Sequence, residues 1–294
     1  MKQLQTPILF IIFNRLDTVK KVFTEIKKVK PEKLFIASDG PRENKKGERE
    51  EVEKIRKWIL KNIDWKCKVE TLFLNENIGP VSAVSGAIDW FFKNVTQGII
   101  LEHDCLPNQG FFRFCEEMLE KYMNEEKVMM VSGTNFIDEK TKNEKESYFF
   151  SKNVYIWGWA SWRRAWEGYN SELKEKDFEE IKKLNLNFIE RILFRKRMRD
   201  TILKKHTWDL QLWFKILKAG GLSIIPKRNL VKNIGFDDLA LNTKPNKWDI
   251  KYLQKERGSL RFPLIHPSEI KQNRKLDRKL LEKDLKRVLL KKLF

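Results

Sequence analysis

The residues best suited to chemistry stand directly after an apolar stretch. Residues 98–101 are apolar apart from their first glycine, and Glu102, His103 and Asp104 follow at once. Two carboxylates two positions apart at the end of a strand can hold a hard divalent cation through oxygen, and that cation can hold a diphosphate. The alternative is an ordinary polar strand end. The polar ends of the neighbouring apolar stretches favour the metal site.

Two of those neighbouring stretches end in residues that could bind a nucleotide. Asn14 and Arg15 follow the apolar run 8–13, and a guanidinium offers a planar fork of donors to a nucleobase or phosphate. An ion pair on the rim of a sheet explains Arg15 equally well. Asp39 follows the run 34–37 and could accept a hydrogen bond from a nucleobase imide, although its Ser-Asp-Gly-Pro context also indicates a simple turn.

Asn77 and Gly79, followed by Pro80, open a predicted helix. The backbone N–H groups of a helix N-terminus can point at a phosphate. A helix cap explains the same residues, with Asn77 near the N-cap and Pro80 in the first turn. Both interpretations can hold together.

Tryptophans mark two places in the second half of the chain. Trp157, Trp159 and Trp162 surround Gly158, which suggests a surface loop whose indole faces could carry a sugar; core packing is the equal alternative. Trp208 and Asp209 stand at the start of another predicted helix. The helix dipole favours an acidic residue there, which by itself is a sufficient structural explanation for Asp209.

The elements that position these residues alternate along the first part of the chain. Strands are expected at five apolar runs and helices between them; the strands are 8–13, 34–37, 69–74, 98–101 and 128–131. Alternating strands and helices predict an α/β fold with a mostly parallel central sheet and helices on both faces. Ligands bind such sheets beyond the carboxyl ends of the strands, where the polar residues lie.

The rest of the chain is less regular. A basic helix is expected over 178–205, a helix over 208–217, a strand over 222–225 and a basic amphipathic helix over 270–293. Leu281, Leu285, Val288 and Leu289 fall on one face of that last helix. We expect a catalytic domain at 1–269, with a nucleotide-binding half at 1–132 and an acceptor-side half at 133–269, and a basic helical tail at 270–294.

Composition limits the class of protein. With 41% hydrophobic residues, the chain of 294 residues can bury enough surface to fold. Its three cysteines form no close pair, so neither a disulfide framework nor a cysteine-rich zinc site is expected. No apolar stretch reaches the roughly 20 residues that span a bilayer. We expect a cytoplasmic protein, either free or peripheral on the inner face of the membrane.

The formal net charge of +19 indicates an anionic partner. Much of the excess lies in 189–205 and 271–294, outside the predicted nucleotide-binding sheet. The tail at 271–294 therefore suits adsorption to an anionic membrane, while a solvated or dimer-packing helix is an equal alternative.

Taken in order, the motifs resemble the GT-A fold nucleotide-sugar glycosyltransferases. The similarity is greatest to enzymes of the N-acetylglucosaminyltransferase I type and their bacterial relatives in glycan biosynthesis, and it spans about residues 6–235. The order and strand-end placement of several short motifs carry it. The matching residues are Asn14-Arg15, Asp39, Glu102-His103-Asp104, Gly158-Trp159 and Trp208-Asp209.

The resemblance implies an inverting transferase that moves a hexosyl or N-acetylhexosaminyl group from a nucleotide-diphosphate sugar, most simply a UDP-sugar, to a glycan or lipid-linked saccharide. Asp104 would bind Mn²⁺ or Mg²⁺, and Asp209 would be the general base. The expected nucleotide-binding residues are Asn14, Arg15, Asp39, Asn77, Gly79, Glu102 and His103, and the expected sugar-binding residues are Trp157, Gly158, Trp159, Trp162 and Trp208. Polysaccharide or lipopolysaccharide biosynthesis is the expected setting.

Two departures from the family pattern bear on the metal. His103 replaces the middle acid of the metal motif, which matters little if Asp104 holds the cation. A late histidine that relatives carry after an Asn-Ile-Gly segment is missing, because Asn242 stands there instead.

Two other functions compete with sugar transfer. The charge and the 10 tryptophans would suit a nucleic-acid-binding protein. No recognised nucleic-acid-binding motif is present, however, and we do not expect the protein to bind nucleic acid. A sugar nucleotidyltransferase would share the α/β fold, but the glycine-rich loop that it needs after the first strand is missing.

Overall fold

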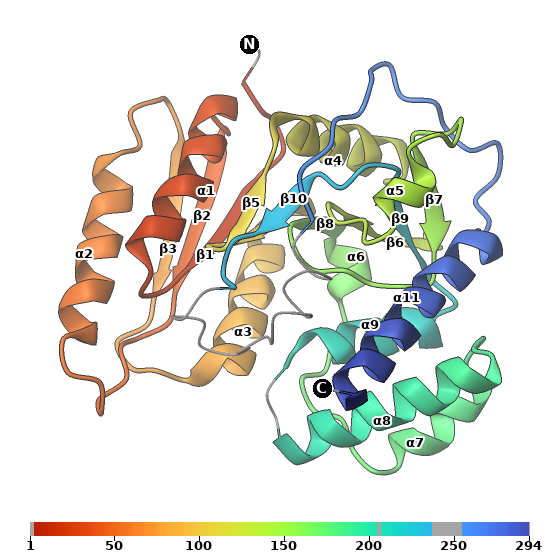
Figure 1. Cartoon of the computed structure of the whole chain (residues 1–294). Coiled ribbons are helices and arrows are strands. Elements are labelled where there is room, and N and C mark those ends of the chain that lie inside the picture. The colour runs from red at the N-terminus through yellow and green to blue at the C-terminus, as the bar shows by residue number, and fades with distance from the viewer. Residues whose placement is uncertain (1–2, 205–206, 237–254, 294) are drawn as a thin grey trace.

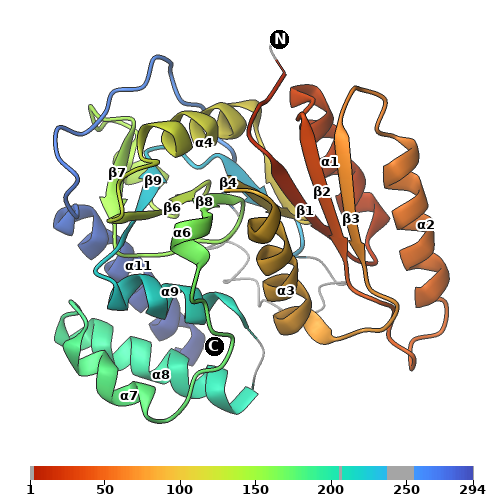
Figure 2. The ribbon, with the colours of Figure 1, turned by 180° about the vertical axis from the view of Figure 1, so that it is seen from behind.

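The computed structural model describes residues 3–204, 207–236 and 255–293. An eight-stranded sheet crosses the molecule in the order β3-β2-β1-β4-β8-β6-β9-β7, with helices on both faces (Figures 1 and 2). Six of these strands point the same way, whereas β7 and β8 are antiparallel to their neighbours. The expected α/β class with a mostly parallel central sheet is therefore confirmed.

The first half of the sheet follows the predicted alternation. Its strands are β1 (Ile8–Ile12), β2 (Lys33–Ser38), β3 (Lys68–Phe73) and β4 (Gln97–Glu102), and its helices are α1 (Leu16–Val29), α2 (Glu48–Lys61) and α3 (Gly79–Asn94). Every residue of β1 is buried, because both faces of this central strand are covered. Phe10 packs in the core with α1 and α2, whereas Leu9 packs in the core with α3.

The second half adds short strands, of which the sequence pattern predicts two, at 128–131 and 222–225. The strands are β5 (Cys105–Pro107), β6 (Val128–Ser132), β7 (Tyr148–Ser151), β8 (Trp159–Trp162), β9 (Leu222–Pro226) and β10 (Val231–Asn233). The helices are α4 (Gln109–Lys121), α5 (Asp138–Thr141), α6 (Arg163–Trp166), α7 (Asp177–Glu180), η1 (Ile181–Lys183, a 3-10 helix), α8 (Phe188–Lys204), α9 (Asp209–Lys218) and α11 (Arg274–Leu293). Strand β8 lies between β4 and β6 and joins the two halves in one sheet.

The single helix expected over 178–205 is wrong in one respect, because the chain leaves helical geometry after η1. Leu184 is extended and buried in a small core with Phe194 of α8. A capping box then restarts the helix: the Asn187 side chain accepts from the Glu190 N–H at 3.0 Å, and the Glu190 carboxylate accepts from the Asn187 N–H at 2.7 Å.

Helix α11 is anchored in the core over its first turns. Leu276 and Leu280 are buried with Ile137, which precedes α5, and with residues of β7 and β9. Asp277 is buried as well and accepts hydrogen bonds from the Ser151 hydroxyl and the Gln272 amide. The buried face therefore differs from the one expected from Leu281 and Leu285, which are only partly buried; the side chains of Val288 and Leu289 lie outside the described residues. No described helix combines the length and apolar character needed to cross a bilayer.

Candidate functional site

The carboxyl ends of β1 and β4 open onto a cavity of about 630 Å³. The two strands pair in parallel with Ile11 opposite Glu102, so the residues that follow both strands lie at the same edge of the sheet. Arg15, Glu102 and Asp104 all line the cavity, together with His103. The structure therefore brings together two of the strand ends that sequence analysis selected.

Asp209 reaches the same cavity from the other half of the chain. It is the first residue of α9, it lines the cavity beside Trp208, and its carboxylate accepts a hydrogen bond from the Thr207 hydroxyl. The Trp208 ring stacks on Trp159 with centroids 6.0 Å apart, and the Tyr169 hydroxyl donates to the Trp208 carbonyl at 2.9 Å. This aromatic packing holds the start of α9, and with it Asp209, at the cavity wall.

Acidic side chains cluster on this wall. Burial, together with the neighbouring carboxylates of Asp104 and Asp209, raises the pKa of Glu102 to about 8. Burial also lowers the pKa of His103, and Arg15 acts in the same direction while Asp104 opposes it. A cavity wall with several close carboxylates and a neutral histidine is suited to a cation.

A two-stranded ribbon brings a glycine against Asp104. The residues after Asp104 form β5, which pairs with β10 so that Cys105 lies opposite Asn233. The Ile234 N–H donates to the Asp104 carbonyl at 2.8 Å. A Cβ on Gly235 would overlap with Oδ2 of Asp104 and would lie 3.1 Å from its Cγ, so only glycine permits this approach. The Arg15 guanidinium donates to the Gly235 carbonyl at 3.4 Å, which ties both residues to the same loop.

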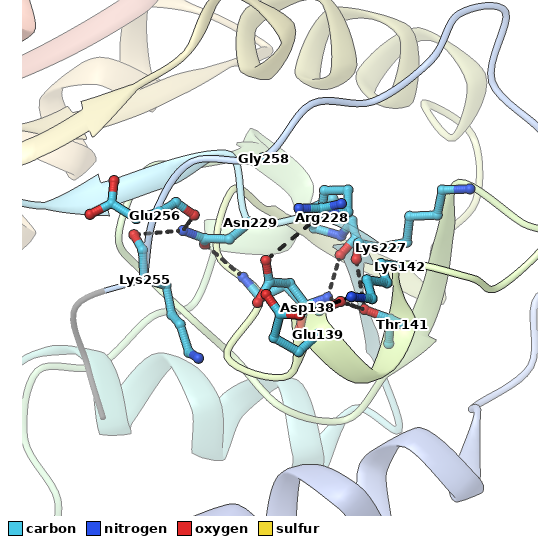
Figure 3. A network of polar contacts seen from close by, with 12 residues as sticks. Asp138, Glu139, Thr141, Lys142, Lys227, Arg228, Asn229, Lys255, Glu256 and Gly258 are labelled. Atoms are coloured by element: carbon cyan, nitrogen blue, oxygen red, sulfur yellow. Dashed lines mark hydrogen bonds and ion pairs between the residues drawn. The ribbon is translucent and has the colours of Figure 1, made fainter. Parts of the chain in front are cut away.

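A buried asparagine fixes the chain that enters this ribbon. Asn229 is fully buried, and its Nδ2 donates to the carbonyls of Lys255 (3.2 Å) and Glu256 (3.2 Å) (Figure 3). It also donates to the Val231 carbonyl at 2.8 Å. Its Oδ1 accepts from the Asn135 N–H at 3.0 Å. One side chain therefore joins the start of β10 to the loop after β6 and to residues 255 and 256.

The structure places four of the predicted nucleotide-binding residues beside the cavity rather than in its lining. The Asp39 carboxylate accepts from the Asn77 amide at 2.9 Å and from the Gly79 N–H at 3.1 Å, and it also accepts from the Ile78 N–H. It therefore caps the N-terminus of α3, whose Pro80 does line the cavity. Asn14 donates to the Glu48 carboxylate at 2.8 Å and lies outside the lining as well.

Only two of the four selected tryptophans line the cavity, namely Trp157 and Trp208. Trp159 and Trp162 are buried on opposite faces of the sheet because β8 alternates its side chains. The Trp162 Nε1 donates to the Leu119 carbonyl at 3.1 Å. Core packing therefore accounts for both residues. Gly158 is buried in a left-handed conformation (φ 63°) just before β8 and outside the lining.

Sequence analysis missed the part of the lining that two helices supply. Arg197 and Asp200 come from α8, and Lys283 and Asp284 come from α11. Arg197 and Asp284 form an ion pair of 3.0 Å between the two helices. No local pattern marks these residues, because their proximity depends on how α8 and α11 pack. Residues 233–235 are the Asn-Ile-Gly segment of the sequence pattern, and Asn242 lies outside the described residues.

No family model and no curated protein sequence matches the chain. Solved structures with similar folds include a mannosyltransferase from Pyrobaculum calidifontis in complex with GDP-Man and Mn²⁺, at 11% identity, covering 74% of each chain with a TM-score of 0.40. Mouse xyloside xylosyltransferase 1 matches at 11% identity over 72% of this chain and 81% of its own, with a TM-score of 0.36. A cytidylyltransferase from Leptospira borgpetersenii matches at 11% identity over 70% of this chain and 74% of its own, with a TM-score of 0.34.

Proposed function

We propose that the protein is an inverting glycosyltransferase of the GT-A type that uses a nucleotide-diphosphate sugar, most simply a UDP-sugar. One observation carries the proposal: Asp104 at the end of β4 and Asp209 at the start of α9, far apart in the sequence, line one cavity with Arg15 between the ends of β1 and β10. A metal-binding carboxylate and a separate general base are the two acidic functions that such a transfer needs.

Asp104 would hold the cation, Mn²⁺ or Mg²⁺. Among the described residues no group of three or more histidine, cysteine and acidic side chains could hold a metal ion. A single carboxylate nevertheless fits a cation that completes its shell with substrate phosphate oxygens and water, as Mg²⁺ commonly does. The acidic side chains of Glu102 and Asp209 also favour a cation there, because a cation would relieve the repulsion that raises the pKa of Glu102. When bound, the metal would supply neutralisation of the charge that develops on the departing diphosphate.

Asp209 would act on the acceptor. Its carboxylate takes the proton of the acceptor hydroxyl while that oxygen forms a bond to the anomeric carbon of the donor sugar and the bond to the nucleoside diphosphate breaks. One such displacement inverts the anomeric centre. The Thr207 hydroxyl and the packed Trp208 hold the carboxylate in place for this proton transfer.

The remaining residues would bind the two substrates. Arg15 supplies donors for a phosphate or nucleobase, and Asp39, Asn14, Asn77, Gly79, Glu102 and His103 stay our predicted nucleotide-binding residues. Trp157 lies within 5.2 Å of Phe136 and 5.4 Å of Phe236 between ring centroids. This aromatic wall offers apolar faces to a sugar. The acceptor is proposed to be a glycan or a lipid-linked saccharide.

A donor screen tests the proposal. Thermal shift with UDP, GDP, CDP and their sugars, each with and without Mn²⁺, should show a metal-dependent rise in melting temperature for one nucleotide. With that donor, Asp209→Asn should lower the transfer rate by about 10²–10⁴-fold and leave the nucleotide-induced shift unchanged. Asp64→Asn, on an exposed carboxylate, is the matched control.

Three results would contradict the assignment. Undiminished transfer by Asp209→Asn would show that Asp209 is not the general base. Release of pyrophosphate from a nucleoside triphosphate would identify a nucleotidyltransferase instead. A salt-sensitive RNA mobility shift in a protein that no nucleotide sugar stabilises would identify a nucleic-acid-binding protein.

A further inference from the structure

Helix α8 exposes large apolar side chains to solvent. Phe188 is 78% exposed, Leu203 is 74% exposed and Ile192 is 51% exposed, and Ile189 is exposed as well. Among the described residues, these are four of the eight large hydrophobic side chains that are exposed. Single exposed apolar residues are ordinary, but a concentration of them on one helix marks an interaction surface.

The exposed residues share one face of the helix with basic ones. Phe188, Ile192 and Leu203 are separated by multiples of about one helical turn, which places them along one side. Arg195, Lys196 and Arg199 are exposed between them, and none of the three forms an ion pair with a described residue. We use the term α8 face for the four apolar and three basic residues together, namely Phe188, Ile189, Ile192, Arg195, Lys196, Arg199 and Leu203.

The opposite side of α8 is firmly packed. Phe194 and Met198 are buried against Leu210 and Phe214 of α9. Glu190 is not available to neutralise the α8 face, because it pairs with Lys152 at 2.6 Å in a largely buried contact. The helix is thus fixed to the molecule by one side and presents the other side to solvent.

We propose that the α8 face docks on the surface of an anionic lipid bilayer. Apolar side chains that alternate with arginine and lysine are the composition of helices that lie in the membrane interface, where the apolar groups enter the acyl boundary and the cations meet the headgroups. A second copy of this chain is a poorer occupant, because it would bring two sets of like charges together. Nucleic acid would leave Phe188 and Leu203 without an apolar partner.

Docking through α8 would hold the cavity next to the membrane. Arg197, Asp200 and Thr201 of the same helix line the cavity, and both views place α8 at the edge of the molecule beside α7 and α11 (Figures 1 and 2). A bound α8 face would therefore favour an acceptor that is itself anchored in the bilayer. This last step rests on the proposed function, whereas the docking itself does not.

The basic tail is not the surface that we assign. Leu276 and Leu280 of α11 belong to the core, so removal of residues 270–294 would damage the fold. The experiment therefore uses substitutions in the full chain. One variant is Phe188→Gln/Ile192→Gln/Leu203→Gln, and a second is Arg195→Gln/Lys196→Gln/Arg199→Gln.

The matched control is Leu60→Gln/Met123→Gln, which removes exposed apolar side chains of 43% and 51% exposure far from α8 in sequence. Each protein is sedimented with vesicles of phosphatidylcholine alone and with vesicles that also contain phosphatidylglycerol, after circular dichroism has shown unchanged helix content. We expect the wild type and the control to bind the anionic vesicles. Each α8 variant should lose at least about tenfold in partition coefficient.

Several outcomes would overturn the assignment. These are α8 variants that bind anionic vesicles like the wild type, a wild type that does not bind them, and a concentration-dependent dimer that Phe188→Gln/Ile192→Gln/Leu203→Gln abolishes. Loss of RNA binding by the basic-residue variant without any vesicle binding would also overturn it. The vesicle assay contains no donor, metal or acceptor. Its failure would therefore leave the proposed transfer reaction untouched, and failure of the donor screen would leave the proposed lipid binding untouched.

Discussion

Gly235→Ala is the substitution that most directly tests how the ribbon β5–β10 positions Asp104. The added methyl group would overlap with Oδ2 of Asp104 and would lie 3.0 Å from its Cβ and 3.1 Å from its Cγ. Carbon atoms in contact prefer about 3.5–4.0 Å, so the carboxylate or the loop has to retreat by roughly 0.5–1 Å. The loop cannot retreat freely, because the Ile234 N–H is bound to the Asp104 carbonyl. We therefore expect the carboxylate to move.

The expected cost has a structural part and a functional part. Overpacking of this kind lowers the free energy of unfolding by about 1–3 kcal/mol. A displacement of about 1 Å at a catalytic group can lower a rate by roughly 10²-fold. We expect Gly235→Ala to weaken the Mn²⁺-dependent thermal shift and to lower the transfer rate by about that factor.

The matched control is Gly86→Ala in the middle of α3. No atom lies within 4 Å of its added methyl group, and alanine in place of a helical glycine should raise the free energy of unfolding by about 1 kcal/mol. Urea unfolding, metal titration and transfer assays on both variants give the comparison. If Gly235→Ala binds Mn²⁺ and transfers sugar like the wild type, then Asp104 is not the metal ligand or the ribbon does not position it.

Three further changes have defined outcomes. Asn229→Ala should lower the free energy of unfolding by about 2–4 kcal/mol in urea, because it leaves several buried backbone groups without partners. Tyr169→Phe should cost about 1 kcal/mol of stability and lower kcat more than it raises KM for the donor, because the Trp208 carbonyl that precedes Asp209 loses its partner. Burial lowers the pKa of Lys283 to about 8, so as the pH rises the folded state releases that proton before the unfolded state does. Between pH 8 and 10.5 the free energy of unfolding of the wild type, measured in urea, should therefore rise relative to that of Lys283→Met. The same pH dependence of the free energy of unfolding in both proteins would contradict this.

The parts of the fold that could be predicted are those fixed by local pattern. The continuous apolar run at β1 required burial on both faces, and the helices α1 to α3 followed from their periodicity. The strands β5 and β10, of three residues each, could not be predicted, because so short a strand exists only through its pairing partner. The same reason hid β8, whose tryptophans suggested a surface loop but supply core on both faces.

In the candidate site, too, local pattern predicts some residues, whereas others come together only through tertiary packing. Arg15 and Asp104 could be selected because a parallel sheet brings its strand ends to one edge, and both line the cavity. Asp209 was selected only through the order of motifs, and its arrival at the cavity depends on tertiary packing around Trp208. Arg197 and Asp284 gave no signal, because their ion pair joins helices that only the folded chain brings together.

The place of β8 in the sheet has a consequence for biosynthesis. Strand β4 completes its pairing only when residues 159–162 arrive, and β6 meets the rest of the sheet only through β8. A nascent chain that has left the ribosome up to about residue 132 therefore carries β4 as an open edge, ready to pair with another chain. A fragment that ends at residue 132 would expose the same edge of β4, because that edge is closed by residues 159–162.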